Sequence, residues 1–285
     1  MPRTLHVIDR AAHDESGLGL PPLLFVHGGY THSGCWGENF LAFFQQRGYH
    51  CVALDLSGHG KSAGRDLLDD FGIDDYADDV RQVAASLDCQ PVLIGHSMGA
   101  IVVQRYLEKS PARGVVMLAP VPPTGVSASA MRLAARQPDY FCEAERTLRG
   151  DYTENTIRVM HAVYFSPDAS LEDLRAFLPM VQDESMRAIA DLVALLLRQP
   201  RKRPRIPALV IGGELDALFP ANRLYFTAAG WNAETCVIPR AGHILTLDPQ
   251  WPQVAAKIDG WLQRNFATQA VMAAGGAGGV RVVHL

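Results

Sequence analysis

The sequence predicts an α/β fold with a mostly parallel sheet, and two patterns carry this prediction. Short apolar runs recur along the chain, each ending at Gly, Pro or a polar residue. Such runs, without polar alternation, are typical of strands buried on both faces. Segments with helical spacing of apolar residues lie between the runs, and strands that alternate with helices imply crossover connections and parallel strands.

The elements follow in order from these patterns. The apolar runs predict strands over 23–26, 51–54, 92–94, 114–118, 208–211 and 235–238. The intervening and following segments predict helices over 40–47, 73–87, 98–109 and 251–266.

Between residues 121 and 205 the alternation stops, and only helices are expected, over 128–137, 153–163, 171–178 and 185–198. A plain crossover needs far fewer residues, so a cap over the sheet is favoured over ordinary connecting helices. Ligands of open α/β sheets bind outside the carboxyl ends of the strands, where such a cap would lie. The predicted organisation is a core of 1–120 and 206–267, a helical cap of 121–205 and a flexible Gly/Ala-rich tail of 268–285.

Composition and charge exclude several classes of protein. Lys and Arg number 26 against 30 Asp and Glu, a net charge of −4 without a basic stripe, so nucleic acid is not an expected partner. The five cysteines are scattered and never spaced as CxxC, which argues against a disulfide framework or a zinc site. The N-terminus shows no secretory pattern, and the longest apolar run, 192–197, is too short to be a transmembrane segment. A soluble, cytoplasmic protein is expected.

The motif Gly95-His96-Ser97-Met98-Gly99 lies between an expected strand and an expected helix. A serine in such a tight turn has a strained backbone and an exposed hydroxyl. A side chain at either glycine would collide with neighbouring backbone. The start of the helix also points free N–H groups at the serine, which favours negative charge there. Ser97 is the predicted nucleophile.

A nucleophilic serine needs a base that is held by a third group. Asp216 and His243 follow the next two expected strands, and the order Ser97, Asp216, His243 is the one expected after a nucleophile elbow. His243 is the predicted base and Asp216 the acid that orients it. Glu214 is the rival acid, but Asp216 is preferred from its distance past the strand.

Acyl transfer also needs hydrogen-bond donors for the developing oxyanion. The backbone N–H groups of Met98 and Gly29 are the predicted donors, with Tyr30 as the alternative to Gly29. His27 is expected to organise this loop by hydrogen bonding rather than to act in catalysis.

With these motifs, residues 23–266 resemble the α/β-hydrolase superfamily, in its capped soluble serine esterase and lipase-like branch. The matching pieces are HGG at 27–29, DLSGHGKS at 55–62, GHSMG at 95–99, GGELDALFP at 212–220 and AGH at 241–243. The resemblance implies an eight-stranded, mostly parallel sheet with a helical cap between strands six and seven. It also implies a Ser-His-Asp triad that needs neither metal nor cofactor, and a segment 55–62 that shapes the fold.

Ser97 at the elbow argues against haloalkane dehalogenases and epoxide hydrolases of this fold, which use Asp. The predicted function is cleavage of a small-molecule carboxylic ester with an apolar acyl part, as in a carboxylesterase or lysophospholipase, through an acyl-enzyme. A thioesterase, a C–C bond hydrolase or an acyltransferase would use the same triad. A cofactor-free perhydrolase, lyase or dioxygenase, or a ligand receptor with a slow triad, are alternatives from other classes. No oligomeric state is predicted.

Apolar cap residues are expected to form the cap core and to line part of an acyl pocket. They are Tyr140, Phe141, Tyr152, Met160, Tyr164, Phe165, Phe177, Leu178, Met180, Met186 and Leu192. Arg132, Arg136, Arg158 and His161 are candidates for recognising a carboxylate or phosphate head group.

Overall fold

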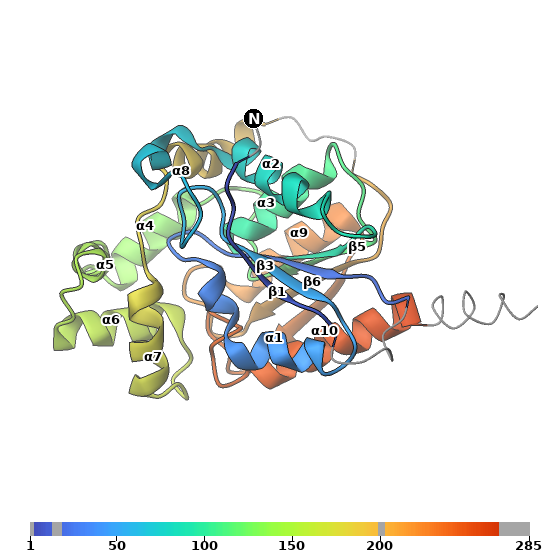
Figure 1. The fold of residues 1–285 in the computed structure, drawn as a ribbon. Helices are drawn as coiled ribbons and strands as arrows, with labels where there is room; N and C mark the ends of the chain where they lie inside the picture. Colours follow the sequence, from blue (N-terminus) through green and yellow to red (C-terminus); the bar gives the residue numbers. More distant parts are fainter. Residues whose placement is uncertain (1–2, 13–18, 199–202, 268–285) are drawn as a thin grey trace, which may run out of the picture.

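A seven-stranded sheet forms the centre of the computed structural model, which describes residues 3–12, 19–198 and 203–267 (Figure 1). The strands are β1 (Val7–Arg10), β2 (Leu23–Val26), β3 (Cys51–Leu54), β4 (Val92–His96), β5 (Gly114–Leu118), β6 (Ala208–Gly213) and β7 (Glu234–Ile238). Their order across the sheet is β1-β3-β2-β4-β5-β6-β7. Only β1 runs antiparallel, against β3, so the predicted α/β class and the six predicted strands are confirmed.

Two features of the sheet differ from the expectation. The sequence pattern does not predict β1, because this edge strand alternates between exposed and half-buried residues and lacks an apolar run. The described residues form seven strands rather than the eight that the resemblance implies. The chain just before β1 contacts the loop that follows β3, where the Ala63 amide donates to the Thr4 carbonyl at 3.0 Å. The helical block therefore lies between the fifth and sixth strands of the chain.

Helices pack on both faces of the sheet. Those outside the block 121–205 are α1 (Glu38–Gln45), α2 (Ile73–Ala84), α3 (Met98–Leu107), α9 (Leu224–Trp231) and α10 (Trp251–Leu262), with the short turns η2 (Ser33–Trp36), η3 (Arg65–Asp70), η6 (Ala221–Arg223) and the π-helical η7 (Gln263–Ala267). Successive residues of a strand pack on opposite faces of the sheet. Leu24 and Leu93 belong to the core under α2, α3 and α9, whereas Phe25 and Ile94 belong to the core under α1 and α10 (Figure 1).

The block 121–205 is helical in its described part and forms no strand there. It contains α4 (Ser127–Arg136), α5 (Tyr140–Leu148), α6 (Glu154–Tyr164), α7 (Leu171–Phe177), η4 (Leu178–Met180), α8 (Met186–Val193) and η5 (Ala194–Leu197). Figure 1 shows α4 to α7 gathered beside the sheet, in green to yellow. Their own apolar cluster includes Met160, Leu174 and Phe177, and Ile244 from the loop after β7 joins it.

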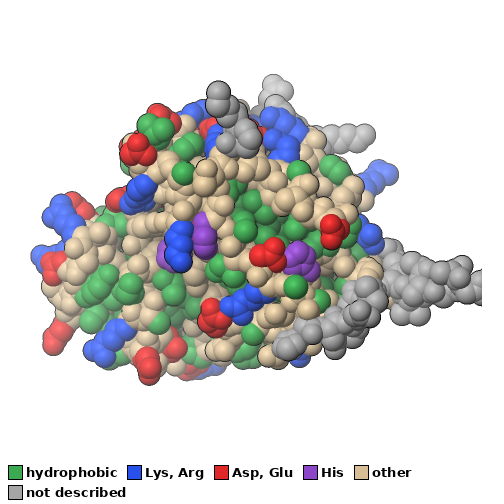
Figure 2. Space-filling model, viewed as in Figure 1, with side chains coloured by type: hydrophobic (Ala, Val, Ile, Leu, Met, Phe, Trp, Pro, Cys, Tyr) green, Lys and Arg blue, Asp and Glu red, His purple; other side chains and the backbone are tan. Residues whose placement is uncertain are grey.

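The surface charges, the helix lengths and the cysteines do not change this description of the fold. Positive and negative side chains are interspersed on the face shown in Figure 2. No helix within the described ranges is long and apolar enough to cross a bilayer. All five cysteines lie in the described part of the chain, and each is free. The tail predicted for 268–285 lies outside the described residues.

Candidate active site

Ser97 occupies the turn between β4 and α3, as the motif predicts. Its backbone angles, φ 52° and ψ −115°, are ones that a non-glycine residue rarely adopts. A Cβ on Gly95 would lie 2.5 Å from the Gly99 carbonyl oxygen, and one on Gly99 would lie 2.3 Å from the Val26 carbonyl oxygen. Only glycine fits at both positions, so the strained turn depends on the two glycines beside it.

Three predicted side chains meet at the carboxyl ends of the strands. His243 Nε2 lies 3.2 Å from Ser97 Oγ, and His243 Nδ1 lies 2.8 Å from Asp216 Oδ2. The amides of Leu218 and Phe219 each donate to Asp216 Oδ1 at 2.8 Å, which fixes the carboxylate. Asp216 and His243 are buried, with exposed fractions of 5% and 2%.

This geometry determines which ring nitrogen of His243 carries the proton. Because a carboxylate only accepts, Nδ1–H donates to Asp216, and Nε2 is left to accept from the Ser97 hydroxyl. Such an imidazole is arranged to take the serine proton. The rival acid, Glu214, is exposed and accepts a hydrogen bond from the Arg240 amide at 2.8 Å instead.

Two groups that the sequence does not identify hold the His243 backbone. The amides of His243 and Ile244 both donate to the Tyr164 carbonyl, at 2.9 and 3.0 Å, so the end of helix α6 holds the backbone of His243. Nε2–H of His96 donates to the His243 carbonyl at 3.0 Å. Burial, and then the neighbouring His243, lower the pKa of His96 to about 3, so that its ring is neutral. In the sequence, only the position of His96 inside the motif indicates this contact. Tyr164 acts through its backbone carbonyl, so its residue type gives no signal.

The loop after β2 lies beside the start of α3. A Cβ on Gly29 would lie 3.8 Å from Met98 Cβ, so the two predicted oxyanion donors are neighbours. The Tyr30 amide donates to a carboxylate oxygen of Glu184 at 3.3 Å and is therefore occupied. Within the described ranges, the Gly29 and Met98 amides donate to no other group of the protein. His27 receives a hydrogen bond from the Leu56 amide at 3.1 Å and donates to the Gly28 carbonyl at 2.8 Å, which makes it a loop organiser.

A largely apolar cavity of about 380 Å³ opens onto Ser97 and His243. Six of the expected cap residues line it: Tyr140, Phe141, Met160, Tyr164, Phe177 and Leu192. Leu133, Leu218 and Phe219 add further apolar surface. The four candidates for head-group recognition are not among its described lining residues. Arg132, for example, donates to the Leu218 carbonyl, and His161 donates to the Ala169 carbonyl.

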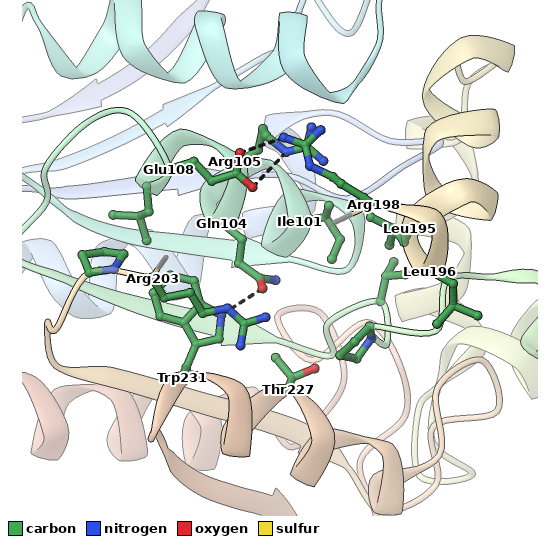
Figure 3. A pocket seen from close by; sticks show the side chains of 14 residues that line it. Ile101, Gln104, Arg105, Glu108, Leu195, Leu196, Arg198, Arg203, Thr227 and Trp231 are labelled. Atoms are coloured by element: carbon green, nitrogen blue, oxygen red, sulfur yellow. Dashed lines mark hydrogen bonds and ion pairs between the residues drawn. The ribbon is translucent and has the colours of Figure 1, made fainter. Parts of the chain in front are cut away.

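A second cavity, of about 390 Å³, lies between α3, α9 and η5 (Figure 3). Glu108 bridges Arg105 and Arg198, at 3.6 and 2.7 Å, and the Trp231 indole donates to Gln104 at 2.9 Å. Its described lining holds no nucleophile with a neighbouring base. The described walls of this cavity therefore hold no pair of side chains like Ser97 and His243.

The segment 55–62 shapes the neighbouring loops, as the resemblance implies. The Asp55 carboxylate accepts from the amides of Ser33 and Lys61, at 2.8 and 2.9 Å. A Cβ on Gly60 would lie 2.3 Å from Asp55 Oδ2, and Gly60 has a positive φ of 52°. Both facts require glycine at this position.

Comparison with known proteins gives sequence matches over about a third of the chain and structural matches over most of it. A non-heme haloperoxidase of Rhodococcus erythropolis is 38% identical over 110 residues, which cover 36% of this chain and 38% of the relative. A bifunctional esterase/perhydrolase of Acinetobacter calcoaceticus is 36% identical over 107 residues, with coverage of 36% and 38%. The matches thus span well under half the length of these curated relatives.

Solved structures match over most of the chain. An esterase of Thermogutta terrifontis gives a TM-score of 0.65 at 21% identity, covering 92% of this chain and 94% of that one. An esterase of Exiguobacterium antarcticum gives 0.68 at 16% identity, covering 92% and 96%. At these identities the likeness shows the fold alone. Residues 23–256 match the model of the alpha/beta hydrolase family, and the chain belongs to that family.

Proposed function

We propose that this protein is a serine hydrolase that cleaves a carboxylic ester with an apolar acyl part. One observation carries the proposal: Ser97 Oγ lies 3.2 Å from His243 Nε2, with Asp216 behind the imidazole, at the opening of a largely apolar cavity. Nucleophile, base and orienting acid in this geometry are the requirements of acyl-enzyme chemistry. Membership of the alpha/beta hydrolase family supports it.

The reaction proceeds in two halves. Ser97 Oγ attacks the ester carbonyl while His243 takes its proton, and Asp216 stabilises the imidazolium. The oxyanion of the tetrahedral intermediate accepts hydrogen bonds from the Gly29 and Met98 amides, and the α3 N-terminus favours its charge. His243 then protonates the leaving alcohol. In the second half His243 deprotonates water, which attacks the acyl group and releases the acid and Ser97.

The apolar acyl part is inferred from the cavity. Cap residues such as Leu133, Phe177 and Leu192 line it, and the cap is proposed to be the block 121–205. A pocket of this size with few polar groups matches the usual form of a small-molecule site. Burying an acyl chain there removes apolar surface from water, which favours longer acyl groups by about 0.8 kcal/mol per methylene.

A perhydrolase activity is the second candidate, and the similarity to the bifunctional esterase/perhydrolase favours it. The acyl-enzyme would be the same, but hydrogen peroxide would attack in place of water. The peroxide oxygen bonds to the acyl carbon, the bond to Ser97 Oγ breaks, and Ser97 regains its proton through His243. The product is a peroxy acid, without a metal or another cofactor.

A burst assay with p-nitrophenyl acetate and p-nitrophenyl octanoate tests both candidates. We expect turnover and a transient acyl adduct on Ser97 by intact mass spectrometry, both lost in Ser97→Ala and retained in Ser86→Ala, a serine outside the site. Peroxy acid formed when hydrogen peroxide is added would establish the second activity. If the wild type shows neither turnover nor adduct with either ester, the ester hydrolase proposal is wrong, and a lyase or a ligand receptor becomes the better interpretation.

A further inference from the structure

The cap segment 182–185 is hydrogen-bonded to the loop that carries Gly29. The Gln182 amide donates to the Tyr30 carbonyl at 2.9 Å, and Gln182 Nε2 donates to the Thr31 carbonyl at 2.7 Å. The Tyr30 amide in turn donates to Glu184 Oε2 at 3.3 Å. Both backbone groups of Tyr30 are therefore bonded to the cap, and Tyr30 has a positive φ of 61°, which is costly for a residue with a side chain.

Glu184 is a buried carboxylate with a full set of donors. Its side chain has an exposed fraction of 0%, as has that of His59, whose Nε2 lies 3.1 Å from Glu184 Oε2. The Tyr76 hydroxyl and the Ser185 amide donate to Oε1, at 2.9 and 2.8 Å. A buried carboxylate is tolerated when it is paired and hydrogen-bonded in this way.

The surroundings of His59 indicate an imidazolium. Nδ1 faces the Ser57 carbonyl at 3.1 Å and Nε2 faces the Glu184 carboxylate, so both ring nitrogens face acceptors and both carry protons. Burial alone would lower the pKa of His59, but the Glu184 charge and these hydrogen bonds raise it. Burial would likewise raise the pKa of Glu184, but His59, together with the hydrogen bonds from the Ser185 amide and the Tyr76 hydroxyl, lowers that pKa.

The position of this pair matters for the proposed oxyanion site. A Cβ on Gly29 would lie 3.3 Å from Glu184 Oε2, so the carboxylate lies beside the peptide whose amide is the proposed donor. By accepting from the Tyr30 amide, Glu184 fixes the orientation of the next peptide along the loop. An unpaired negative charge here would oppose the oxyanion, and His59 offsets that charge.

We propose that Glu184, paired with His59, is a positioning residue of the oxyanion loop, so that seating the cap segment 182–185 and completing the oxyanion site are one event. This inference rests on the proposed ester hydrolase function, in which the Gly29 amide binds the oxyanion. Glu184 does not touch the substrate; it acts through Tyr30 and the loop 28–31.

The test compares Glu184→Gln with Glu172→Gln. Glu172 is an exposed acid in the first turn of α7 and lies outside the segment 182–185. For Glu184→Gln we expect kcat for p-nitrophenyl acetate to fall about 10- to 100-fold with KM nearly unchanged, as misplacement of a transition-state donor does. Glu184→Asp should recover part of kcat, and Glu172→Gln should match the wild type.

A second readout does not depend on activity. Amide hydrogen exchange of the loop 28–31 should be faster in Glu184→Gln than in the wild type and unchanged in Glu172→Gln. If Glu184→Gln fails to fold, Gln182→Ala gives the same test, because it removes only the bond to Thr31 and one from the Gly60 amide at 3.2 Å. It should speed exchange and lower kcat a few-fold.

Unchanged exchange in these variants would overturn the positioning role, whatever the activity. Faster exchange with unchanged kcat would overturn the link to the oxyanion site and leave Glu184 a purely structural residue. A wild type without an acyl-enzyme in the burst assay would overturn the proposed function instead, and the exchange result would still report on the loop. The two failures are thus distinguishable.

Discussion

Two buried carboxylate–histidine pairs lie in the described part of this protein, Asp216–His243 and Glu184–His59, and they differ in what faces the second ring nitrogen. The oxygen–nitrogen distances are 2.8 and 3.1 Å, and all four side chains are nearly inaccessible to solvent. His243 Nε2 faces the Ser97 hydroxyl, which can donate its proton. In His59 the second nitrogen faces the Ser57 carbonyl, which can only accept.

The difference teaches that a carboxylate beside a histidine does not define a base. A neutral imidazole between an acceptor and a hydroxyl is ready to exchange a proton, whereas an imidazolium between two acceptors is not. The first pair is suited to catalysis and the second to holding charge and geometry. The third partner of each ring decides the role, and the predictions below test this distinction.

The largest expected effect separates the two acids near His243. In Asp216→Asn the new amide group faces Nδ1, so the proton moves to Nε2 and the ring can no longer accept from Ser97. We expect kcat for p-nitrophenyl acetate to fall about 10⁴-fold with the fold retained.

Glu214→Gln is the matched control for this variant, because Glu214 is exposed and contacts the Arg240 amide. It should change kcat less than about two-fold, as is usual for surface substitutions. If kcat falls less than about ten-fold in Asp216→Asn, or falls strongly in Glu214→Gln, Asp216 is not the orienting acid.

The next effect concerns stability and belongs to the second pair. Removing one partner of a buried ion pair leaves the other uncompensated, so Glu184→Gln should lower the free energy of unfolding by about 3 kcal/mol near pH 5.5. Urea denaturation of the variant and the wild type measures this difference.

The pH dependence of that difference has a definite sign. A raised pKa of His59 contributes stability that is full below its ordinary value of 6.5 and is lost as the pH rises through the raised pKa. The lowered pKa of Glu184 contributes stability above its ordinary value of 4.5, which is lost as the pH falls through the lowered one.

The stabilisation is therefore largest between about pH 4.5 and 6.5 and shrinks on the alkaline side. Other groups that face the pair are Tyr76, the neutral His27, whose pKa is lowered to about 4, and Arg65, which opposes the charge on His59. A difference between wild type and Glu184→Gln that stays constant from pH 5.5 to 9 would show that His59 is not charged.

The contrast between the pairs also explains what the sequence can predict. Ser97 and Asp216 follow the buried strands β4 and β6, and His243 follows the edge strand β7, which still carries an apolar run. Local patterns therefore locate all three, and the parallel sheet brings them together. The Glu184–His59 contact joins residues 125 positions apart, and Glu184 lies in a loop of the block 121–205 without a local pattern. Packing of that block on the rest of the protein decides the contact, and no short motif encodes it.

The fold likewise contains elements that the sequence predicts and elements that it does not. The buried parallel strands are predictable because burial on both faces requires apolar runs, but β1 is an edge strand with a mixed pattern. Helix α9 (Leu224–Trp231) is not predicted either, because it is apolar around much of its surface and leaves Tyr225 and Phe226 exposed. Helical periodicity is absent from such a segment.

The smallest expected effect tests which of the two cavities takes the acyl chain. Leu133 is 4% exposed and lines the cavity at Ser97, whereas Leu196 is 65% exposed and lines the cavity of Figure 3. In Leu133→Trp the larger side chain occupies space that an octanoyl group would fill, so kcat/KM for p-nitrophenyl octanoate should fall about 10-fold relative to the acetate. That is the loss of burying roughly two methylenes, at about 0.8 kcal/mol each.

Leu196→Trp makes the same change beside the other cavity and should leave the octanoate-to-acetate ratio unaltered. A loss of stability in Leu133→Trp would lower kcat/KM for both esters alike and leave their ratio unaltered, so the ratio reports on the size of the cavity. A fall confined to Leu196→Trp would place the acyl chain between α3, α9 and η5, away from the apolar cap residues. That result would mean that the residues around Ser97 do not set the acyl-chain preference, because the two cavities share only Val121 as a described wall residue.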